Sequence, residues 1–161
     1  MTPARLLTLA IDPALSLLPA EMQTPEARAL LLAIALQESR ISKRRQLGGG
    51  PARSYFQFEQ TGIADLLTHH RSAPHLLALC AALDLPTSAR ALLRAIEWSD
   101  VLAVLCARLL LWTDPAILPN ATDARRGWAI YTATWRPGRP RPETWHAYFD
   151  IGWTTVTGAS R

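Results

Sequence analysis

The chain has 161 residues, of which 49% are hydrophobic and 19% are charged, and its formal net charge is +4. This length and balance exclude an intrinsically disordered chain, and they predict a single globular domain over residues 1–161. A membrane span is not expected, because Arg28 and Arg108 interrupt the longest apolar stretches before they reach roughly 20 residues.

Apolar residues recur at spacings of three and four along most of the chain, and strand signals are scarce. The sequence therefore predicts an all-α domain with little or no sheet. Residues 1–20 are expected to form an N-terminal helical extension, with a short helix or a broken pair over 4–18, around Pro13. The apolar run after Arg5 ends at Asp12, too early for a cleaved secretion signal, so we expect no signal peptide.

The firmest predicted helix begins after Thr24, which can cap it. Pro25 suits the first helical position, and Glu26 suits the positive end of the helix dipole. Apolar residues then surround the helix over 27–36, which is typical of a buried central helix. The helix should end near 39–41, because the glycine run at 48–50 and Pro51 cannot continue it.

The remaining elements follow in order. Residues 54–59 are either extended or lead into a helix that ends near residue 70. Further helices are predicted over 74–83, 88–97, 99–112 and 123–135, with Ser88, Ser99 and Asp123 as caps. Residues 115–120 are expected to be a loop, 136–142 a turn-rich connector and 143–149 a final helix, followed by a flexible tail over 154–161.

Positive charge is carried almost entirely by arginine, since Lys43 is the only lysine. Bacterial cell wall, nucleic acid and acidic lipid are all attracted by such a charge, and the codon usage of a GC-rich genome explains it equally well. No nucleic-acid partner is expected, because the arginines are scattered over several segments and no reading motif occurs.

The cysteines and histidines give no sign of a metal site. Cys80 and Cys106 lie in apolar helical patterns, where free cysteines behave as small buried hydrophobic residues, and a disulfide between them is left open. No histidine has a spacing that completes a zinc site with them, and no phosphate-binding glycine motif is present. We expect neither a metal nor a cofactor. The four histidines are His69, His70, His75 and His146.

Glu38 is the first candidate functional residue, because it falls in the last turn of the central helix. A carboxylate there faces the negative end of the helix dipole, which disfavours the anion and helps to keep the group protonated. Such locally unfavourable placement is found more often where function requires it. The alternative is an exposed glutamate at a frayed helix end.

Residues 50–62 add the other groups that glycosidic cleavage needs. The reaction requires a proton donor at the leaving oxygen and stabilisation of an oxocarbenium-like transition state. Glu38 is predicted to be the donor, and Gln57 to hydrogen-bond a sugar hydroxyl or N-acetyl group. Tyr55, Phe56 or Phe58 are expected either to pack on the apolar face of a sugar ring or to belong to the core.

The order of these residues resembles the lysozyme-like superfamily of soluble lytic transglycosylases and goose-type lysozymes. In that family a helix ends in a catalytic Glu followed by Ser, as Glu38 and Ser39 do here. A glycine-led stretch then leads to a Gln in the substrate groove, which residues 50–57 match, and Tyr131 matches a Tyr on a later helix that lines the active site. The resemblance implies a lysozyme-like domain that acts on peptidoglycan glycan strands, as a monomer, with Ser39 and Tyr131 in the groove.

The chain as a whole resembles a group of phage and prophage proteins within this superfamily. Their shared pattern is close to Leu-Gln-Glu-Ser, Gly-Gly-Pro-Ala, Gln-Phe-Glu and Trp-Arg-Pro-Gly, which occur here at 36–39, 49–52, 57–59 and 135–138. This chain departs from the family at Ser54, where a Gly is common, and at Thr132, where the transglycosylases have Asn. The resemblance implies a protein that stays in the cytoplasm of a bacterial host until exported, or that is carried in a phage particle.

Three functions remain open at this point. In a lytic transglycosylase, Glu38 protonates the glycosidic oxygen and then accepts a proton as a 1,6-anhydro ring closes. In a hydrolytic lysozyme a second carboxylate is needed, for which Glu59 is the first candidate and Asp65 the second. Glu59 is equally well explained by an ion pair with Arg44, Arg45 or Arg53. The third function is a non-catalytic phage structural or wall-binding module that keeps the groove without turnover.

Overall fold

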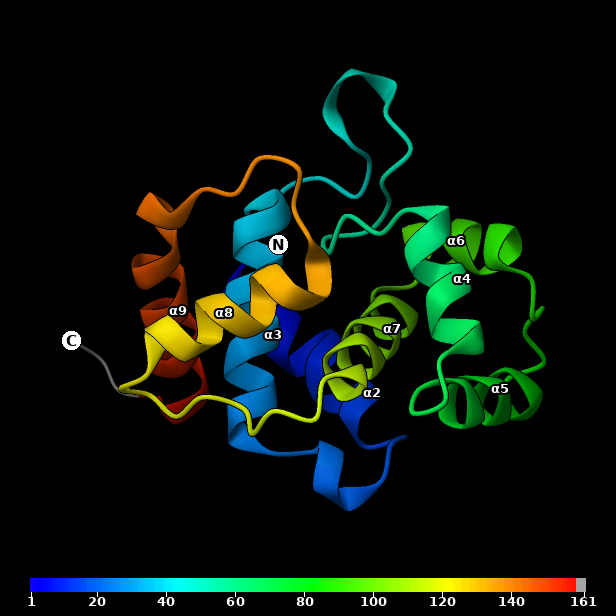
Figure 1. Cartoon of the computed structure of the whole chain (residues 1–161), viewed down its shortest axis with the longest axis horizontal. Helices are drawn as coiled ribbons and strands as arrows, with labels where there is room; N and C mark the ends of the chain where they lie inside the picture. The colour runs from blue at the N-terminus through cyan, green and yellow to red at the C-terminus, as the bar shows by residue number, and fades with distance from the viewer. Residues whose placement is uncertain (159–161) are drawn as a thin grey trace.

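The structure is a computed structural model that describes residues 1–158, and over these residues it is all-α, as predicted. No strand forms among the described residues, where β pairing is limited to isolated bridges in the segment after the central helix. Two long helices, Asp100–Thr113 and Pro142–Thr157, pack against the central helix Pro25–Ser39, and the helices between Gln60 and Trp98 pack against Asp100–Thr113 on the other side of the molecule (Figure 1). In chain order the elements are α1 (Pro3–Leu6), η1 (Leu7–Ile11), α2 (Asp12–Leu15), η2 (Ala20–Met22), α3 (Pro25–Ser39), η3 (Leu47–Gly49), α4 (Gln60–Thr68), α5 (Ala73–Ala82), α6 (Ala89–Trp98), α7 (Asp100–Thr113), α8 (Ala124–Trp135) and α9 (Pro142–Thr157).

The central helix is α3, and its local signals act as the sequence predicts. Thr24 caps it, because its side-chain oxygen accepts a hydrogen bond from the amide of Ala27 at 3.2 Å. All residues from Ala29 to Gln37 are buried. Helix α9 lies along α3 (Figure 1), and a Cβ atom at Gly152 would lie only 2.4 Å from the carbonyl oxygen of Ala29. The absence of a side chain at residue 152 therefore allows the two helices to approach closely.

The N-terminal segment is part of the core rather than an appendage. Leu6, Ile11 and Leu15 are each 0% exposed and belong to the main hydrophobic cluster. The helical path runs from α1 through the π-helical η1 into α2. Pro13 is the second residue of α2 and follows directly on the π-helical turn η1 within this path.

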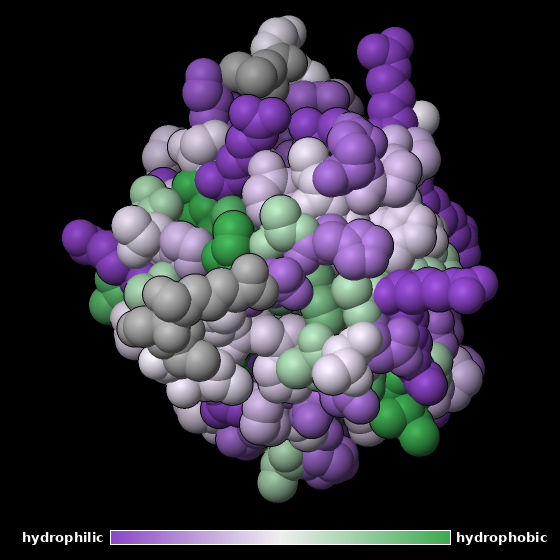
Figure 2. All heavy atoms as spheres, turned by 90° about the vertical axis from the view of Figure 1, so that its left-hand side faces the viewer, coloured by the Kyte–Doolittle hydropathy of each residue, from purple (hydrophilic) through white to green (hydrophobic). Residues whose placement is uncertain are grey.

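The C-terminal helix is longer than the sequence analysis expects. The predicted helix end at 149 and flexible tail from 154 are wrong, because α9 continues to Thr157; residues 159–161 lie outside the described part of the chain. The hydroxyls of Thr155 and Thr157 donate to main-chain carbonyls one turn earlier, and Trp153 packs against the core. The side of the molecule on which α9 lies is mostly polar, with hydrophobic side chains in small separate groups (Figure 2).

Helices α4 to α7 form the other half of the domain (Figure 1). The predicted caps Ser88 and Ser99 accept hydrogen bonds from the amides at the starts of α6 and α7. Cys80 and Cys106 are both free and buried, and burial raises the pKa of the Cys106 thiol to about 12. Among residues 1–158, no helix has the length and apolar character that crossing a membrane requires.

Candidate functional site

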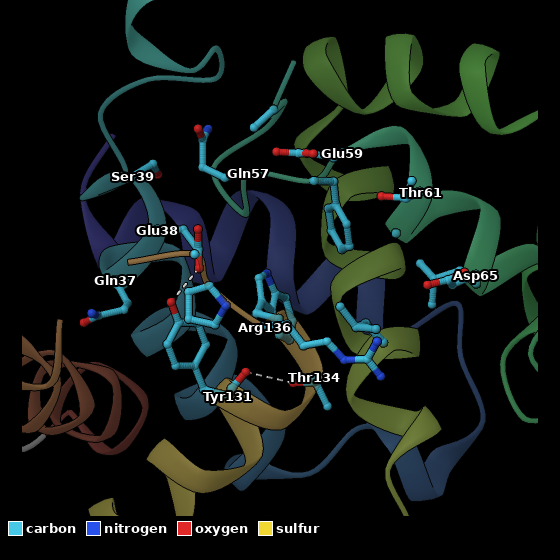
Figure 3. A pocket seen from close by; sticks show the side chains of 18 of the residues that line it. Gln37, Glu38, Ser39, Gln57, Glu59, Thr61, Asp65, Tyr131, Thr134 and Arg136 are labelled. Atoms are coloured by element: carbon cyan, nitrogen blue, oxygen red, sulfur yellow. Dashed lines mark hydrogen bonds between the residues drawn. The ribbon is translucent and has the colours of Figure 1, made fainter. Parts of the chain in front are cut away.

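A cavity of about 1360 Å³ lies where the ends of α3 and α8 meet the loop 40–59 and helix α4 (Figure 3). Its walls come from five parts of the chain that are distant in sequence. They are the last turn of α3, the loop 40–59, α4, the end of α7, and the end of α8 with the connector 136–141. Glu38, Ser39, Gln57, Glu59 and Tyr131 all line this cavity, so the fold brings these five predicted site residues together.

Glu38 is in the last turn of α3, and its carboxyl group faces the phenol of Tyr131 (Figure 3). The Tyr131 hydroxyl donates a hydrogen bond to Glu38 Oε1 at 2.6 Å. Burial raises the pKa of Glu38, and this effect exceeds the opposing effects of the Tyr131 hydrogen bond and the positive charge of Arg141. The alternative of a fully exposed glutamate at a frayed helix end is therefore wrong.

The end of α3 is fixed by local backbone geometry and by a bond to the next loop. Arg40 adopts the left-handed conformation (φ 53°), and its amide donates to the carbonyl of Leu36 at 2.9 Å, which ends the helix. The Ser39 hydroxyl donates to the carbonyl of Tyr55 at 2.8 Å. Ser39 therefore ties the turn that carries Glu38 to the loop that carries Gln57.

Tyr131 is fixed from the other side by aromatic packing in α8 and α9. Its ring stacks on that of Trp145 with a centroid distance of 5.2 Å and an interplanar angle of 12°, and it also contacts Trp128. The residue is only 2% exposed. Burial and the neighbouring Glu38 raise the pKa of the Tyr131 hydroxyl, so it remains a proton donor in the hydrogen bond to Glu38.

A second contact between α3 and the C-terminal region was not predicted from the sequence. Gln37 is buried; its Nε2 donates to the Arg141 carbonyl at 2.9 Å, and its Oε1 accepts from the Thr144 hydroxyl at 2.9 Å. The Arg141 guanidinium donates in turn to the Gln37 carbonyl at 2.7 Å. These bonds bring the cation of Arg141 close to Glu38, where it favours the carboxylate. The arginine and proline pattern over 136–142 indicated a connector but gave no sign of this contact.

The loop after α3 makes a tight turn, and this turn decides which of its aromatic residues reach the cavity. Arg53 and Phe58 exchange two main-chain hydrogen bonds of 2.8 Å each. Tyr55 and Phe56 are 5% and 1% exposed and do not line the cavity. Of the two alternatives for these rings, packing in the core holds for both and packing on a sugar is wrong, because the turn directs the side chains inward. Phe56 packs on the rings of Phe58 and Trp135. Phe58 does line the cavity.

Gln57 lies at the tip of this turn and lines the cavity, as predicted. Its backbone is left-handed (φ 51°), and its Nε2 donates to the carbonyl of Ser54 at 2.8 Å. Ser54 is also left-handed (φ 65°), a conformation that glycine adopts more readily. The side-chain carbonyl of Gln57 is the group of this turn that can accept a hydrogen bond from a ligand.

The two candidate second carboxylates lie across the cavity from Glu38, at the start of α4 and within it (Figure 3). Glu59 and Asp65 are both exposed. The expected pairing of Glu59 with a loop arginine is wrong, because all three arginines bind the region where α6 meets α7. Arg44 binds Asp100 with two bonds of 2.9 and 2.6 Å, while Arg45 and Arg53 bind the buried Glu97 at 2.5 and 3.0 Å.

The turns at the cavity contain left-handed main chain. Left-handed backbone costs roughly 1–2 kcal/mol for a residue with a side chain, so it is rare outside glycine. Within the described chain, six residues other than glycine adopt it, and three of them, Arg40, Gln57 and Arg136, line the cavity. Ile41 and Ser54 belong to the same loop but are buried and do not line the cavity, and Asp84 lies elsewhere.

The cavity wall offers a partly buried acid, an amide, hydroxyls and exposed cations. Within residues 1–158, no group of three or more His, Cys, Asp or Glu side chains is placed to hold a metal ion. Such a set of groups is suited to proton transfer and to hydrogen bonding with a polar, elongated ligand. No protein-family model, curated protein or solved structure matches this chain.

Proposed function

We propose that this protein cleaves the glycan strands of peptidoglycan as a lytic transglycosylase, with Glu38 as the general acid and base. The observation that carries the proposal is the environment of Glu38, a largely buried carboxyl group with a raised pKa at the wall of a large open cavity. Burial favours the protonated form of this carboxyl group, and a protonated carboxyl group is the donor that glycosidic cleavage needs.

In the proposed reaction the Glu38 proton moves to the glycosidic oxygen as the bond from that oxygen to C1 breaks. The hydroxyl on C6 of the same sugar then attacks C1 and closes a 1,6-anhydro ring, while the Glu38 carboxylate takes the hydroxyl proton. The raised pKa serves both steps, because burial makes the carboxylate a better base as well as keeping the acid protonated. The reaction therefore needs no second carboxylate, and it consumes no water.

The surrounding groups support a sugar polymer as the ligand. The cavity extends from the end of α3 to α4. Gln57, Thr61 and Thr134 line it with polar side chains (Figure 3). The resemblance of the Glu38–Ser39 motif to that of glycan-cleaving enzymes also supports a sugar polymer as the ligand. The hydrolytic lysozyme stays as a second candidate because Glu59 lines the opposite wall.

Digestion of purified peptidoglycan, with mass spectrometry of the products, tests the proposal. The wild-type protein should release fragments with 1,6-anhydro ends, and Glu38→Gln should release none while still binding the wall. Glu143→Gln is the matched control, since Glu143 is an exposed glutamate at the start of α9 that does not line the cavity.

The products separate the alternatives. Reducing ends, together with a large loss of activity in Glu59→Gln, mean a hydrolytic lysozyme. Binding to the wall without any product means a binding module. Equal activity in Glu38→Gln and wild type would remove the basis of the proposal.

A further inference from the structure

Basic residues are concentrated on one part of the cavity wall, and the proposed cleavage step gives them no role. Six basic residues line it, in two groups: Arg40, Lys43 and Arg45 after α3, and Arg136, Arg139 and Arg141 after α8. Arg45 is bound by Glu97, and Arg141 donates to the main chain of Gln37. The remaining four, which we name the basic rim, are Arg40, Lys43, Arg136 and Arg139.

The basic rim is exposed, and its charges are not neutralised by the protein. All four side chains are exposed to solvent, and none forms an ion pair with an acidic residue of the described chain. The acidic residues of the cavity other than Glu38 are Glu59, Asp65 and Asp114, which belong to α4 and to the end of α7. One end of the cavity is therefore positive.

The rim lies beside the proposed catalytic acid, because both of its halves begin at helix ends that meet there. The hydrogen bond between Tyr131 and Glu38 joins the C-terminal half of α8 to the last turn of α3. Arg40 directly follows α3 and Arg136 directly follows α8. Figure 3 shows the Arg136 side chain extending into the cavity.

Two of these residues combine a charged side chain with a left-handed backbone. Arg40 and Arg136 are both left-handed, with φ of 53° and 48°, at the position that ends a helix. Glycine or asparagine usually occupies that position, and glycine would remove the strain. A cation near a helix C-terminus is favourable, but the preceding turn provides the same benefit without a left-handed residue.

We propose that the basic rim binds the carboxylates of the peptide stems on peptidoglycan, so that the protein prefers glycan strands that carry peptides over strands that lack them. This inference rests on the proposed function for its substrate. In a peptide-bearing strand the lactyl carboxyl group of each N-acetylmuramic acid is bound in the amide link to the stem, so the carboxylates near the cleavable bond are those of the stem peptides. Arginine and lysine bind carboxylates through charge-assisted hydrogen bonds.

The experiment compares two forms of one substrate, namely glycan strands with their peptides and the same strands after an amidase has removed the peptides and the freed lactyl carboxyl groups have been converted to amides. We expect wild-type kcat/KM to be about three- to tenfold higher on the peptide-bearing strands, as several partly screened charge pairs would give. The preference should be lost in about 1 M salt, where the screening length is about 3 Å.

Paired variants assign the preference to the rim. Arg136→Gln with Arg139→Gln, and separately Arg40→Gln with Lys43→Gln, should each lower the ratio of kcat/KM between the two strand types. Arg125→Gln with Arg126→Gln removes the same charge from exposed positions on α8 that do not line the cavity, and it should keep the wild-type ratio.

Binding of the Glu38→Gln protein to both strand types is measured in parallel, so that this inference and the proposed function can fail separately. Cleavage with equal kcat/KM on both strands, or a ratio that the control pair lowers as much as the rim pairs, would overturn the inference and leave the enzyme in place. Tighter binding to peptide-bearing strands without any cleavage by wild type would keep the inference and remove the proposed catalysis.

Discussion

The buried acid of the site should make the protein less stable than it would be without that acid. Glu38 has a pKa above its ordinary value of 4.5 because burial disfavours its charged form. Folding therefore binds a proton over the pH range between the unfolded and folded pKa values of this group. Stability falls as the pH rises through that range, by at most about 1.4 kcal/mol per pH unit for one proton.

Glu38→Gln removes this penalty and keeps the shape of the side chain, including an oxygen that can accept the Tyr131 hydrogen bond. We expect the variant to be more stable at neutral pH by about 1 kcal/mol, a usual gain when a functional site is relieved of unfavourable groups. For a domain of this size that raises Tm by about 2–4 °C. The gain should disappear below the unfolded pKa, where wild type is protonated in both states.

Thermal unfolding followed by circular dichroism across a pH series measures this difference. Glu59→Gln is the control, since Glu59 is an exposed carboxyl group at the same cavity, and its Tm should stay that of wild type at every pH. A Glu38→Gln protein that is no more stable at pH 7, or whose gain is the same at low pH, would refute the assignment of Glu38 as a destabilised buried acid.

Three further predictions concern the parts that support the site. Tyr131→Phe removes a hydrogen bond that favours the Glu38 carboxylate, so it should raise the pKa of Glu38 further, move the alkaline limb of the kcat/KM profile to higher pH and lower kcat about 10- to 100-fold. An unchanged pH profile would contradict this role of the hydroxyl. Gly152→Ala places a methyl group 2.4 Å from a carbonyl of α3 and should destabilise the fold by about 1–3 kcal/mol in urea unfolding, whereas a neutral effect would mean that α9 can move away. Glu97→Gln weakens the ion pairs that hold the loop 42–58, so amide exchange in that loop should accelerate while exchange in α3 stays slow. Equal protection of the loop in both proteins would show that these ion pairs do not hold it.

The sequence predicts well those features that depend on neighbouring residues. The start of α3 follows from Thr24 and Pro25, and its burial follows from an unbroken apolar run, so the place of Glu38 at a helix end is predictable. The caps at Ser88, Ser99 and Asp123 are also local, because each accepts a bond from an amide three residues later. Local signals of this kind need no knowledge of the packing.

The errors arise where distant parts of the chain decide the outcome. The contact of Gln37 with Arg141 joins residues 104 apart, and no local pattern encodes it. The inward direction of Tyr55 and Phe56 depends on a turn with two left-handed residues, which a short aromatic segment does not reveal. Helix α9 continues past residue 149 while Gly152 packs closely on α3, a contact between distant segments that the small, polar tail does not reveal.

Unfavourable features occur in more than one part of the molecule, and several of them meet at the cavity. A left-handed residue or a desolvated charge lowers stability by roughly 1–3 kcal/mol. Arg108 does not line the cavity, yet burial lowers its pKa to about 10, so a desolvated charge alone does not mark a site. At the cavity, the desolvated Glu38 occurs together with the left-handed Gln57 and two left-handed arginines, and hydrogen bonds from Tyr131, Ser39 and Gln37 hold the surrounding segments in position. The combination of acid, amide and cations, rather than strain by itself, is what the proposed function uses.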